Sequence, residues 1–282
     1  MFSSFTRSFR AGKRPASTPS NPWSPSTDIT PVAWIDASDT SNFSKSGSTL
    51  TSVTDKTGTY TMDINGTPTV VDNGLNSLSV FDFDGSENIK STSYEAQVDG
   101  SGNHWAIGLY LADTVNNNKD SLWSYETNQS PKRDYAISSS AANNTFPGEL
   151  DLDNLSSGRI STSIGDKEHW TSSMSMDNWH IVAVIFNKSG NQIAQRLDGA
   201  NAFTPVNDYD NSLSTNQELR LMVNRSGRKL DGRLAEFFAV AGLPGSGGTD
   251  ITDVEKAEGY LAHKWGVSSL LPVSHPYKSS AP

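Results

Sequence analysis

The 282-residue sequence contains no cysteine. This excludes disulfide bridges, thiolate nucleophiles and zinc sites built on cysteine. The sequence also has no run that approaches the roughly 20 apolar residues of a membrane-spanning helix, so we expect no membrane insertion. Basic residues are fewer than acidic ones, 22 against 31, which gives a net charge of −9. Because nucleic-acid phosphates repel an acidic chain, we expect no nucleic-acid partner.

Residues 1–30 differ in composition from the rest of the chain. They carry four basic residues and no acid before Asp28, and their four prolines lie among Ser and Thr, which favours extended backbone. No apolar stretch follows the basic residues, as it would in a secretory signal. Three phenylalanines spaced three and four apart would form one aromatic face on a helical turn. We therefore predict an extended arm that anchors the protein to a partner. The predicted contact residues are Phe2, Phe5, Arg7, Phe9, Arg10, Lys13 and Arg14.

From residue 31 onward the sequence predicts β-structure. Short apolar runs such as 78–83, 105–111, 219–223 and 232–240 are separated by turn residues, with no helical pattern between them. In 179–186 both alternating sets of side chains are mostly apolar, which indicates a strand covered on both faces. Together these runs predict an all-β fold, an antiparallel β-sandwich.

One helix is predicted near the end of the chain. Thr252 and Glu255 have the spacing of a capping box, in which both side chains bond free N–H groups. An apolar stripe follows at helical spacing, and Gly266 stands where a C-terminal cap belongs. The stripe consists of Val254, Ala257, Leu261 and Trp265.

The end of the chain also resembles a known family. The run 258–266 reads EGYLAHKWG, and Leu271-Pro272 and His275-Pro-Tyr-Lys278 follow it. This resembles the tail of concanavalin A-like, laminin-G-like jelly-roll domains, which is common in phage structural proteins and in surface proteins of aquatic bacteria. Weaker similarities lie upstream, at 34–39, 55–58, 83–85 and 232–236. The resemblance implies a single jelly-roll domain over residues 31–282 that includes the helix and tail, 252–282. It implies no particular activity, because lectins, adhesion modules, glycosidases and virion components share this fold.

One stretch is similar to a catalytic motif. Glu149, Asp151 and Asp153 would lie on one face of a strand, as in the Glu-x-Asp-x-Glu strand of some jelly-roll glucanases. The last position is an Asp here, one methylene shorter, and no aromatic cluster flanks the stretch to bind a sugar. We therefore expect no catalytic residues and no enzyme activity.

Evidence for a cofactor is equally weak. Two stretches rich in Asp and Asn could supply oxygen ligands for calcium, but such residues are also common in turns. They are Asp151, Asp153 and Asn154, and Asn207, Asp208, Asp210 and Asn211. No two of the five histidines have the spacing of a zinc site. Three aromatic residues in predicted strands favour core positions over sugar stacking, namely Trp123, Tyr125 and Trp170. We expect no cofactor and leave calcium as the alternative.

The resemblance of the tail, together with the arm and the absence of cysteine and of a secretory signal, predicts a non-enzymatic phage virion protein, assembled in the host cytoplasm. It would decorate the capsid as a knob, or form part of the neck or tail. The arm would hold it on other virion proteins. We expect a homo-oligomer, with a trimer as the leading expectation. The protein could also contact glycans on the host surface. The alternative is a glycan-binding adhesion module of a bacterial surface protein. A jelly-roll glycosidase is the third interpretation.

Overall fold

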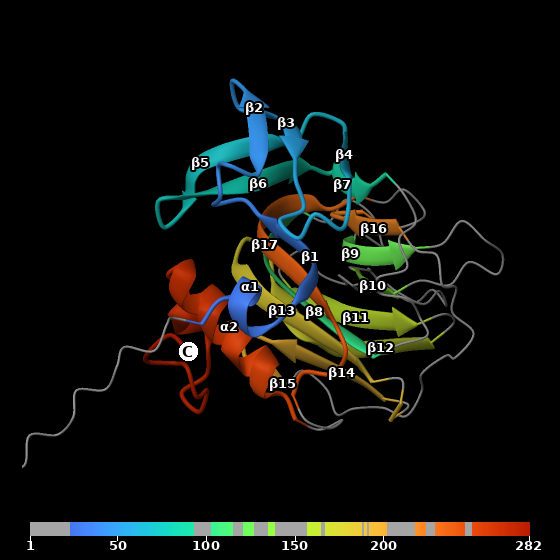
Figure 1. Ribbon diagram of the computed structural model, residues 1–282, viewed down its shortest axis with the longest axis vertical. Helices are drawn as coiled ribbons and strands as arrows, with labels where there is room; N and C mark the ends of the chain where they lie inside the picture. Colours follow the sequence, from blue (N-terminus) through green and yellow to red (C-terminus); the bar gives the residue numbers. More distant parts are fainter. Residues whose placement is uncertain are drawn as a thin grey trace, which may run out of the picture.

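The computed structural model forms two antiparallel sheets and one long helix (Figure 1). It describes residues 23–92, 103–114, 121–126, 135–138, 157–164, 167–187, 189–190, 192–201, 218–223, 229–245 and 250–282. All statements below concern these residues.

The larger sheet has ten strands in the order β15-β14-β13-β8-β17-β6-β5-β3-β2, with β1 also paired to β17. The long strand β17 therefore has two neighbours along one side. Its first half pairs with β6 and its second half with β1. The strands are β1 (Pro31–Asp36), β2 (Phe43–Ser46), β3 (Thr49–Val53), β5 (Thr69–Leu75), β6 (Leu78–Asp84), β8 (His104–Thr114), β13 (Trp179–Asn187), β14 (Gln192–Leu197), β15 (Ala200–Asn201) and β17 (Asp231–Ala241).

The smaller sheet has seven strands in the order β12-β11-β10-β9-β16-β7-β4. They are β4 (Met62–Asn65), β7 (Asn88–Ser91), β9 (Ser121–Glu126), β10 (Tyr135–Ser138), β11 (Ser157–Ile164), β12 (Lys167–Ser175) and β16 (Glu218–Leu221). The predicted all-β sandwich is confirmed.

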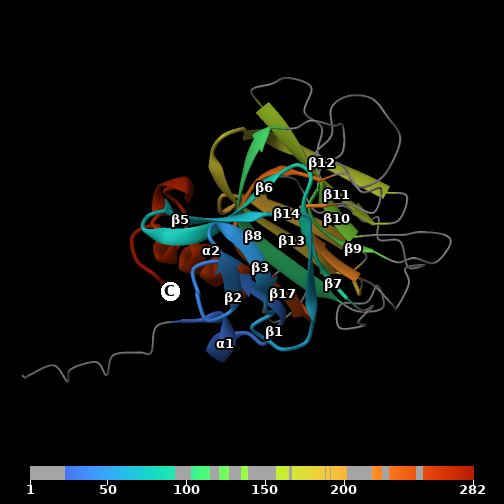
Figure 2. The same ribbon diagram turned by 90° about the horizontal axis from the view of Figure 1, so that it is seen from above.

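Two hydrophobic layers stabilise the domain. Val182, Val184 and Phe186 of β13 face the smaller sheet and pack in the core between the sheets with Trp123 and Phe237. The alternate residues of β13 face the opposite way, into a second core that includes residues of helix α2 (Thr252–Lys264). Both views show α2 on one side of the larger sheet and β9 to β12 on the other (Figure 1, Figure 2). The strand is thus covered on both faces as predicted, and a helix provides its outer cover.

Helix α2 confirms the predicted apolar stripe, whose four members are all fully buried. Its start differs from the predicted capping box. Thr252 is already helical, and Asp250 Oδ1 accepts its N–H at 3.0 Å and its hydroxyl at 2.7 Å. The end is as predicted. Gly266 has φ +66°, and Val267 donates its N–H to the Ala262 carbonyl at 2.8 Å, as in a Schellman cap.

The N-terminal part of the described chain packs on this same layer. A short helix, α1 (Pro25–Asp28), replaces the extended backbone predicted there. Trp23 and Ile29 are 8% and 7% exposed and belong to the second core. The predicted anchoring residues Phe2, Phe5, Arg7, Phe9, Arg10, Lys13 and Arg14 lie outside the described residues. No helix in the described part of the chain is long and apolar enough to cross a membrane.

Candidate functional site

The most prominent polar cluster lies between β1, β17 and the end of α2. In β1, Ala33 and Ile35 face the sandwich core, so Trp34 and Asp36 face the helix. An irregularity in β17 between Leu234 and Glu236 shifts the register, and Glu236 lies directly opposite Asp36. Two carboxylates opposite each other on neighbouring strands destabilise a sheet unless a cation pairs with them.

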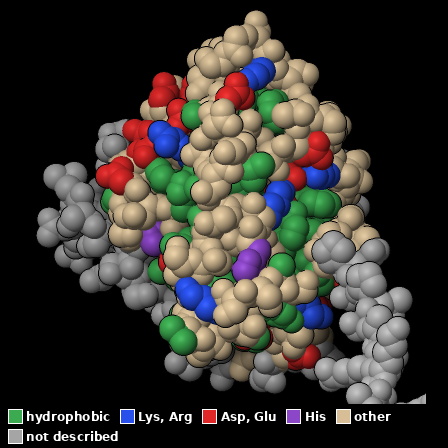
Figure 3. Space-filling model, turned by 90° about the vertical axis from the view of Figure 1, so that its left-hand side faces the viewer, with side chains coloured by type: hydrophobic (Ala, Val, Ile, Leu, Met, Phe, Trp, Pro, Cys, Tyr) green, Lys and Arg blue, Asp and Glu red, His purple; other side chains and the backbone are tan. Residues whose placement is uncertain are grey.

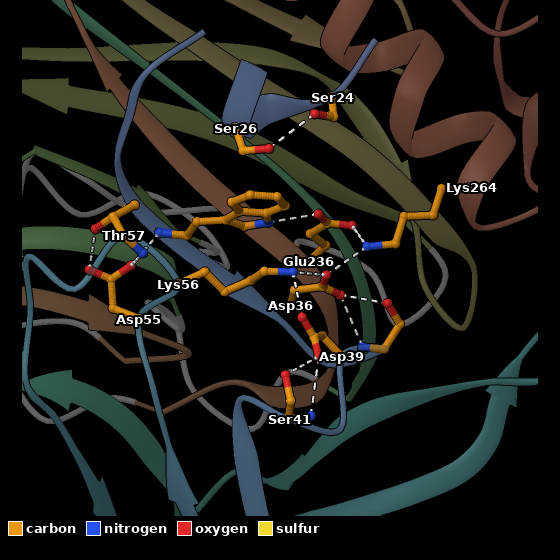
Figure 4. Close-up of polar contacts among 12 residues, drawn as sticks. Ser24, Ser26, Asp36, Asp39, Ser41, Asp55, Lys56, Thr57, Glu236 and Lys264 are labelled. Carbon is orange, nitrogen blue, oxygen red and sulfur yellow. Dashed lines mark hydrogen bonds and ion pairs between the residues drawn. The ribbon is translucent and has the colours of Figure 1, made fainter. Parts of the chain in front are cut away.

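That cation is Lys264, the last residue of α2. Its Nζ lies 2.8 Å from Asp36 Oδ2 and 2.6 Å from Glu236 Oε2 (Figure 4). The two carboxylate side chains are only 3% and 0% exposed, whereas the lysine side chain is 21% exposed. The helix therefore supplies the charge that allows the strands to bury both acids.

Glu236 accepts three further hydrogen bonds. Trp34 Nε1 donates to Oε1 at 2.8 Å, Trp265 Nε1 donates to Oε2 at 2.8 Å, and the Tyr260 hydroxyl donates to Oε1 at 3.1 Å. Burial raises the pKa of Glu236, although Lys264 opposes that shift. Burial and the neighbouring carboxylates also raise the pKa of Tyr260, so its hydroxyl stays protonated and remains a donor. Both oxygens of Glu236 are thus occupied by donors.

A second lysine extends the cluster toward the surface. Lys56 Nζ lies 2.9 Å from Asp36 Oδ2, 2.8 Å from Asp39 Oδ2 and 4.1 Å from the centroid of the Trp34 ring. Burial alone would raise the pKa of Asp36, but Lys264, the Ser38 hydroxyl and Lys56 outweigh it, and the pKa is lowered. Hydrogen bonds from Lys56 and the Ser41 hydroxyl lower the pKa of Asp39 to about 2.

Asp55 fixes the loop that carries Lys56. Its Oδ2 accepts the Thr57 hydroxyl at 2.6 Å (Figure 4). Its Oδ1 accepts the backbone N–H of Trp34 at 2.8 Å, and its Oδ2 also accepts the Tyr60 N–H at 2.9 Å. Asp36 Oδ1 accepts the N–H and hydroxyl of Ser38. Each carboxylate oxygen of Asp36, Asp55 and Glu236 therefore accepts a hydrogen bond or pairs with a lysine. Such saturated carboxylates are better suited to stabilising the fold than to proton transfer.

The tail motif forms a second buried cluster. Arg196 of β14 donates from Nε to Glu258 Oε1 at 2.7 Å and from Nη2 to Oε2 at 2.9 Å, and His275 Nε2 lies 3.0 Å from the same Oε2. Lys278 Nζ donates to the backbone carbonyls of Ser268, Ser269 and Leu271. The residues on which the family resemblance rests therefore fasten the tail and α2 to the sheet. They mark the fold rather than an activity.

A third arrangement has the connectivity of a hydrolase triad. The Ser175 hydroxyl lies 3.0 Å from His180 Nε2, and His180 Nδ1 lies 2.7 Å from Asp198 Oδ2. His180 Nε2 also lies 3.1 Å from the Ser175 carbonyl, so the same ring nitrogen contacts two oxygens of one residue. Ile181 donates its N–H to Asp198 Oδ1 at 2.9 Å, which ties this group to the backbone of β13. The three residues join the turn before β13 to the turn after β14.

Several predicted site residues cannot be placed. Glu149, Asp151, Asp153, Asn154, Asn207, Asp208, Asp210 and Asn211 lie outside the described residues, as do the side chains of Tyr125 and Trp170. Trp123 is fully buried, which confirms the core interpretation. The described residues include no group of three or more His, Asp or Glu side chains that could hold a metal ion. The cluster around Glu236 was not predicted from the sequence. The sequence feature that could have indicated it is a single acidic residue within each of two apolar strand runs.

Comparisons with known proteins identify the fold only. No protein-family model and no curated protein sequence matches the chain. Among solved structures, Trypanosoma rangeli sialidase in complex with sialic acid gives a TM-score of 0.56 at 10% identity, over 82% of this chain and 33% of that one. Domain 4 of AbnA, a GH43 extracellular arabinanase from Geobacillus stearothermophilus in complex with arabinotriose, gives 0.50 at 12% identity, over 67% and 86%. The binding domain of botulinum neurotoxin serotype D/C VPI 5993 gives 0.51 at 12% identity, over 82% and 52%.

These matches agree with a jelly-roll β-sandwich. The chain spans only a third of the sialidase and about half of the neurotoxin domain. None of the three matches supports the predicted similarity to phage proteins.

Proposed function

We propose that this chain is a non-enzymatic, carbohydrate-binding β-sandwich module. Two of the similar structures carry a saccharide, arabinotriose in the arabinanase domain and sialic acid in the sialidase. At 10–12% identity this likeness suggests a ligand class and no specific sugar. The proposal thus takes up the alternative predicted from the sequence.

One observation favours binding over catalysis at the Glu236 cluster. The buried carboxylates of Asp36 and Glu236 accept hydrogen bonds from Lys264, both indole N–H groups and further donors. A retaining glycosidase needs one carboxylate free to attack and one acid free to donate a proton. Neither residue meets that requirement, so this cluster supports stability and leaves binding to other surfaces.

The test is a binding screen combined with an activity assay. The purified full-length protein is applied to a panel of immobilised oligosaccharides, and the same oligosaccharides are incubated in solution and assayed for newly formed reducing ends. We expect retention on at least one glycan and no release of reducing sugar. Hydrolysis that disappears in Glu149→Gln would establish the glucanase interpretation instead. The absence of binding to every glycan would overturn the proposal.

A place in a phage virion is a separate proposal that rests on the tail resemblance and the basic arm. The contacts of Glu258, Lys264 and His275 weaken the first of these, because they serve the fold wherever the domain is used. The remaining support for a virion role is therefore the basic arm. A glycan-binding knob held by such an arm would combine both predicted roles.

A further inference from the structure

The outer face of the larger sheet carries a row of side chains just beyond the Glu236 cluster. Trp179 of β13 pairs with Leu111 of β8, Leu111 pairs with Arg233 of β17, and Arg233 pairs with Asp82 of β6. Strand alternation places these residues on the same face as α2, since their neighbours Ile181, Leu109 and Val80 belong to the second core. Four adjacent strands therefore present an indole, a leucine, a guanidinium and a carboxylate in line.

The row is accessible at the side chains that could bind a ligand. Trp179 is half-buried and packs against the second core. The side chains of Arg233, Asp82 and Asp113 are 35%, 32% and 30% exposed. Figure 3 views this side of the molecule, where acidic side chains lie close to basic ones at several places. A half-exposed aromatic ring beside charged hydrogen-bonding groups suits a sugar ring, whose C–H face is apolar and whose rim carries hydroxyl groups.

Within the described part of the chain, no hydrogen-bond donor reaches two carboxylates at this place, those of Asp113 and Asp231. Arg233 Nε donates to Asp82 Oδ1 at 2.8 Å, but its Nη2 is 3.9 Å from Asp113 Oδ2, too far for a hydrogen bond. Asp231 has no hydrogen-bond donor among the described residues. Burial raises the pKa of both Asp113 and Asp231, and nearby carboxylates add to this shift. Half-buried acceptors of this kind gain from donors that a ligand brings.

We propose that this surface, made of Trp179, Arg233, Asp82, Asp113 and Asp231, binds a neutral oligosaccharide. Its hydroxyl groups donate to Asp113 and Asp231 and accept from Arg233, while one sugar ring stacks on the Trp179 indole. Three carboxylates surround a single guanidinium, so an anionic sugar is repelled. The inference rests on the proposed carbohydrate-binding function and adds its site and its charge preference.

The test uses one matched pair of probes, N-acetyllactosamine oligosaccharides and their sialylated forms, together with the neutral members of the glycan panel. Affinities are measured by calorimetry for the full-length chain, for Asp113→Asn and for Asp231→Asn. Asp63→Asn is the control, because it makes the same chemical change at an exposed position on the smaller sheet. We expect the wild type to prefer neutral glycans. Each site variant should weaken binding about tenfold, because the sugar hydroxyl then donates to a neutral amide oxygen instead of a charged carboxylate.

Each outcome has a defined meaning. Replacing Asp by Asn removes like charge here, so thermal melts should show folded variants, and loss of affinity then reports the site. If the wild type binds a glycan and both site variants bind it equally well, the site is wrong and the proposed function stands. Tighter binding of sialylated forms, or binding abolished by EDTA, also overturns the site. If the wild type binds no glycan, the proposed function fails and this site fails with it.

Discussion

Asp36 and Glu236 face each other across β1 and β17 and share the ammonium group of Lys264. Two buried like charges in adjacent strands would separate the strands if they were unpaired. The shared cation lies 28 positions after Glu236, at the end of α2. Because the cation comes from a different element, the strand pair and the helix stabilise each other.

The first prediction concerns this shared cation. Lys264→Met should lower the free energy of unfolding by about 3–5 kcal/mol, as found when one partner of a buried ion pair is removed. The variant leaves two carboxylates opposite each other, and in the described part of the chain only Lys56 then pairs with Asp36. Urea unfolding at neutral pH measures the loss.

Lys256→Met is the matched control for that measurement. Lys256 lies on the same helix and pairs with Asp253 at 3.5 Å, with both side chains about a third exposed. A partly exposed pair of this kind is worth less than about 1 kcal/mol. Equal losses in the two lysine variants would show that the cluster does not hold the helix in place.

The second prediction concerns acid stability. The pKa of Asp39 falls from 3.8 to about 2 in the folded protein, and that of Asp36 is also lowered. The unfolded chain therefore binds more protons at low pH, so stability falls as the pH drops through this window. Asp39→Asn should make the loss between pH 3.8 and about 2 shallower. Lys56→Met should do the same, because Lys56 is the main cause of the low pKa. A pH profile of Asp39→Asn parallel to that of the wild type would contradict the assignment.

The local parts of the fold could be predicted from the sequence. The stripe from Val254 to Trp265 and the doubly apolar strand 179–186 each follow from side-chain periodicity within one segment. The cap of α2 could not be predicted correctly. Asp250, Thr252 and Glu255 all offer capping groups, and the competition between them is settled by the exact start of the helix.

The long-range parts of the site could not be predicted. Trp34 and Glu236 are 202 positions apart. Their contact depends on β17 changing its neighbour from β6 to β1, close to the irregularity between Leu234 and Glu236 in its pairing with β8. What the sequence does show is a lone acid at the end of the run PVAWID and another inside RLAEFFAV. A carboxylate in such an apolar strand needs a partner once it is buried. The sequence offers no means of choosing Lys264 as that partner.

The third prediction concerns Trp265, which is fully buried and donates its indole N–H to Glu236. Trp265→Ala should lower the free energy of unfolding by about 3–5 kcal/mol, the range for a buried aromatic side chain. Trp265→Phe keeps most of the buried ring and removes the donor, so its loss should be smaller. An unchanged melting temperature in Trp265→Ala would contradict the packing of the helix against the sheet.

The last prediction separates the arm from the domain. Among the described residues, the first buried side chain is Trp23, which packs against Tyr260 with ring centroids 5.5 Å apart, and Pro25 is buried at the start of α1. Deleting residues 1–22 should therefore leave the melting temperature unchanged. Deleting 1–25 also removes Trp23, which should lower the free energy of unfolding by about 3–5 kcal/mol.

The two truncations also test the anchoring role of the arm. If the basic residues and phenylalanines of the arm bind an acidic partner, the protein lacking residues 1–22 should stay folded and lose that partner or its oligomeric state. Binding by the full-length chain should weaken as salt screens the charges. Light scattering at low and high salt and co-sedimentation with the partner particle measure both effects. Full retention of assembly by the shorter protein would place the interface on the domain, because every residue from Trp23 onward is still present.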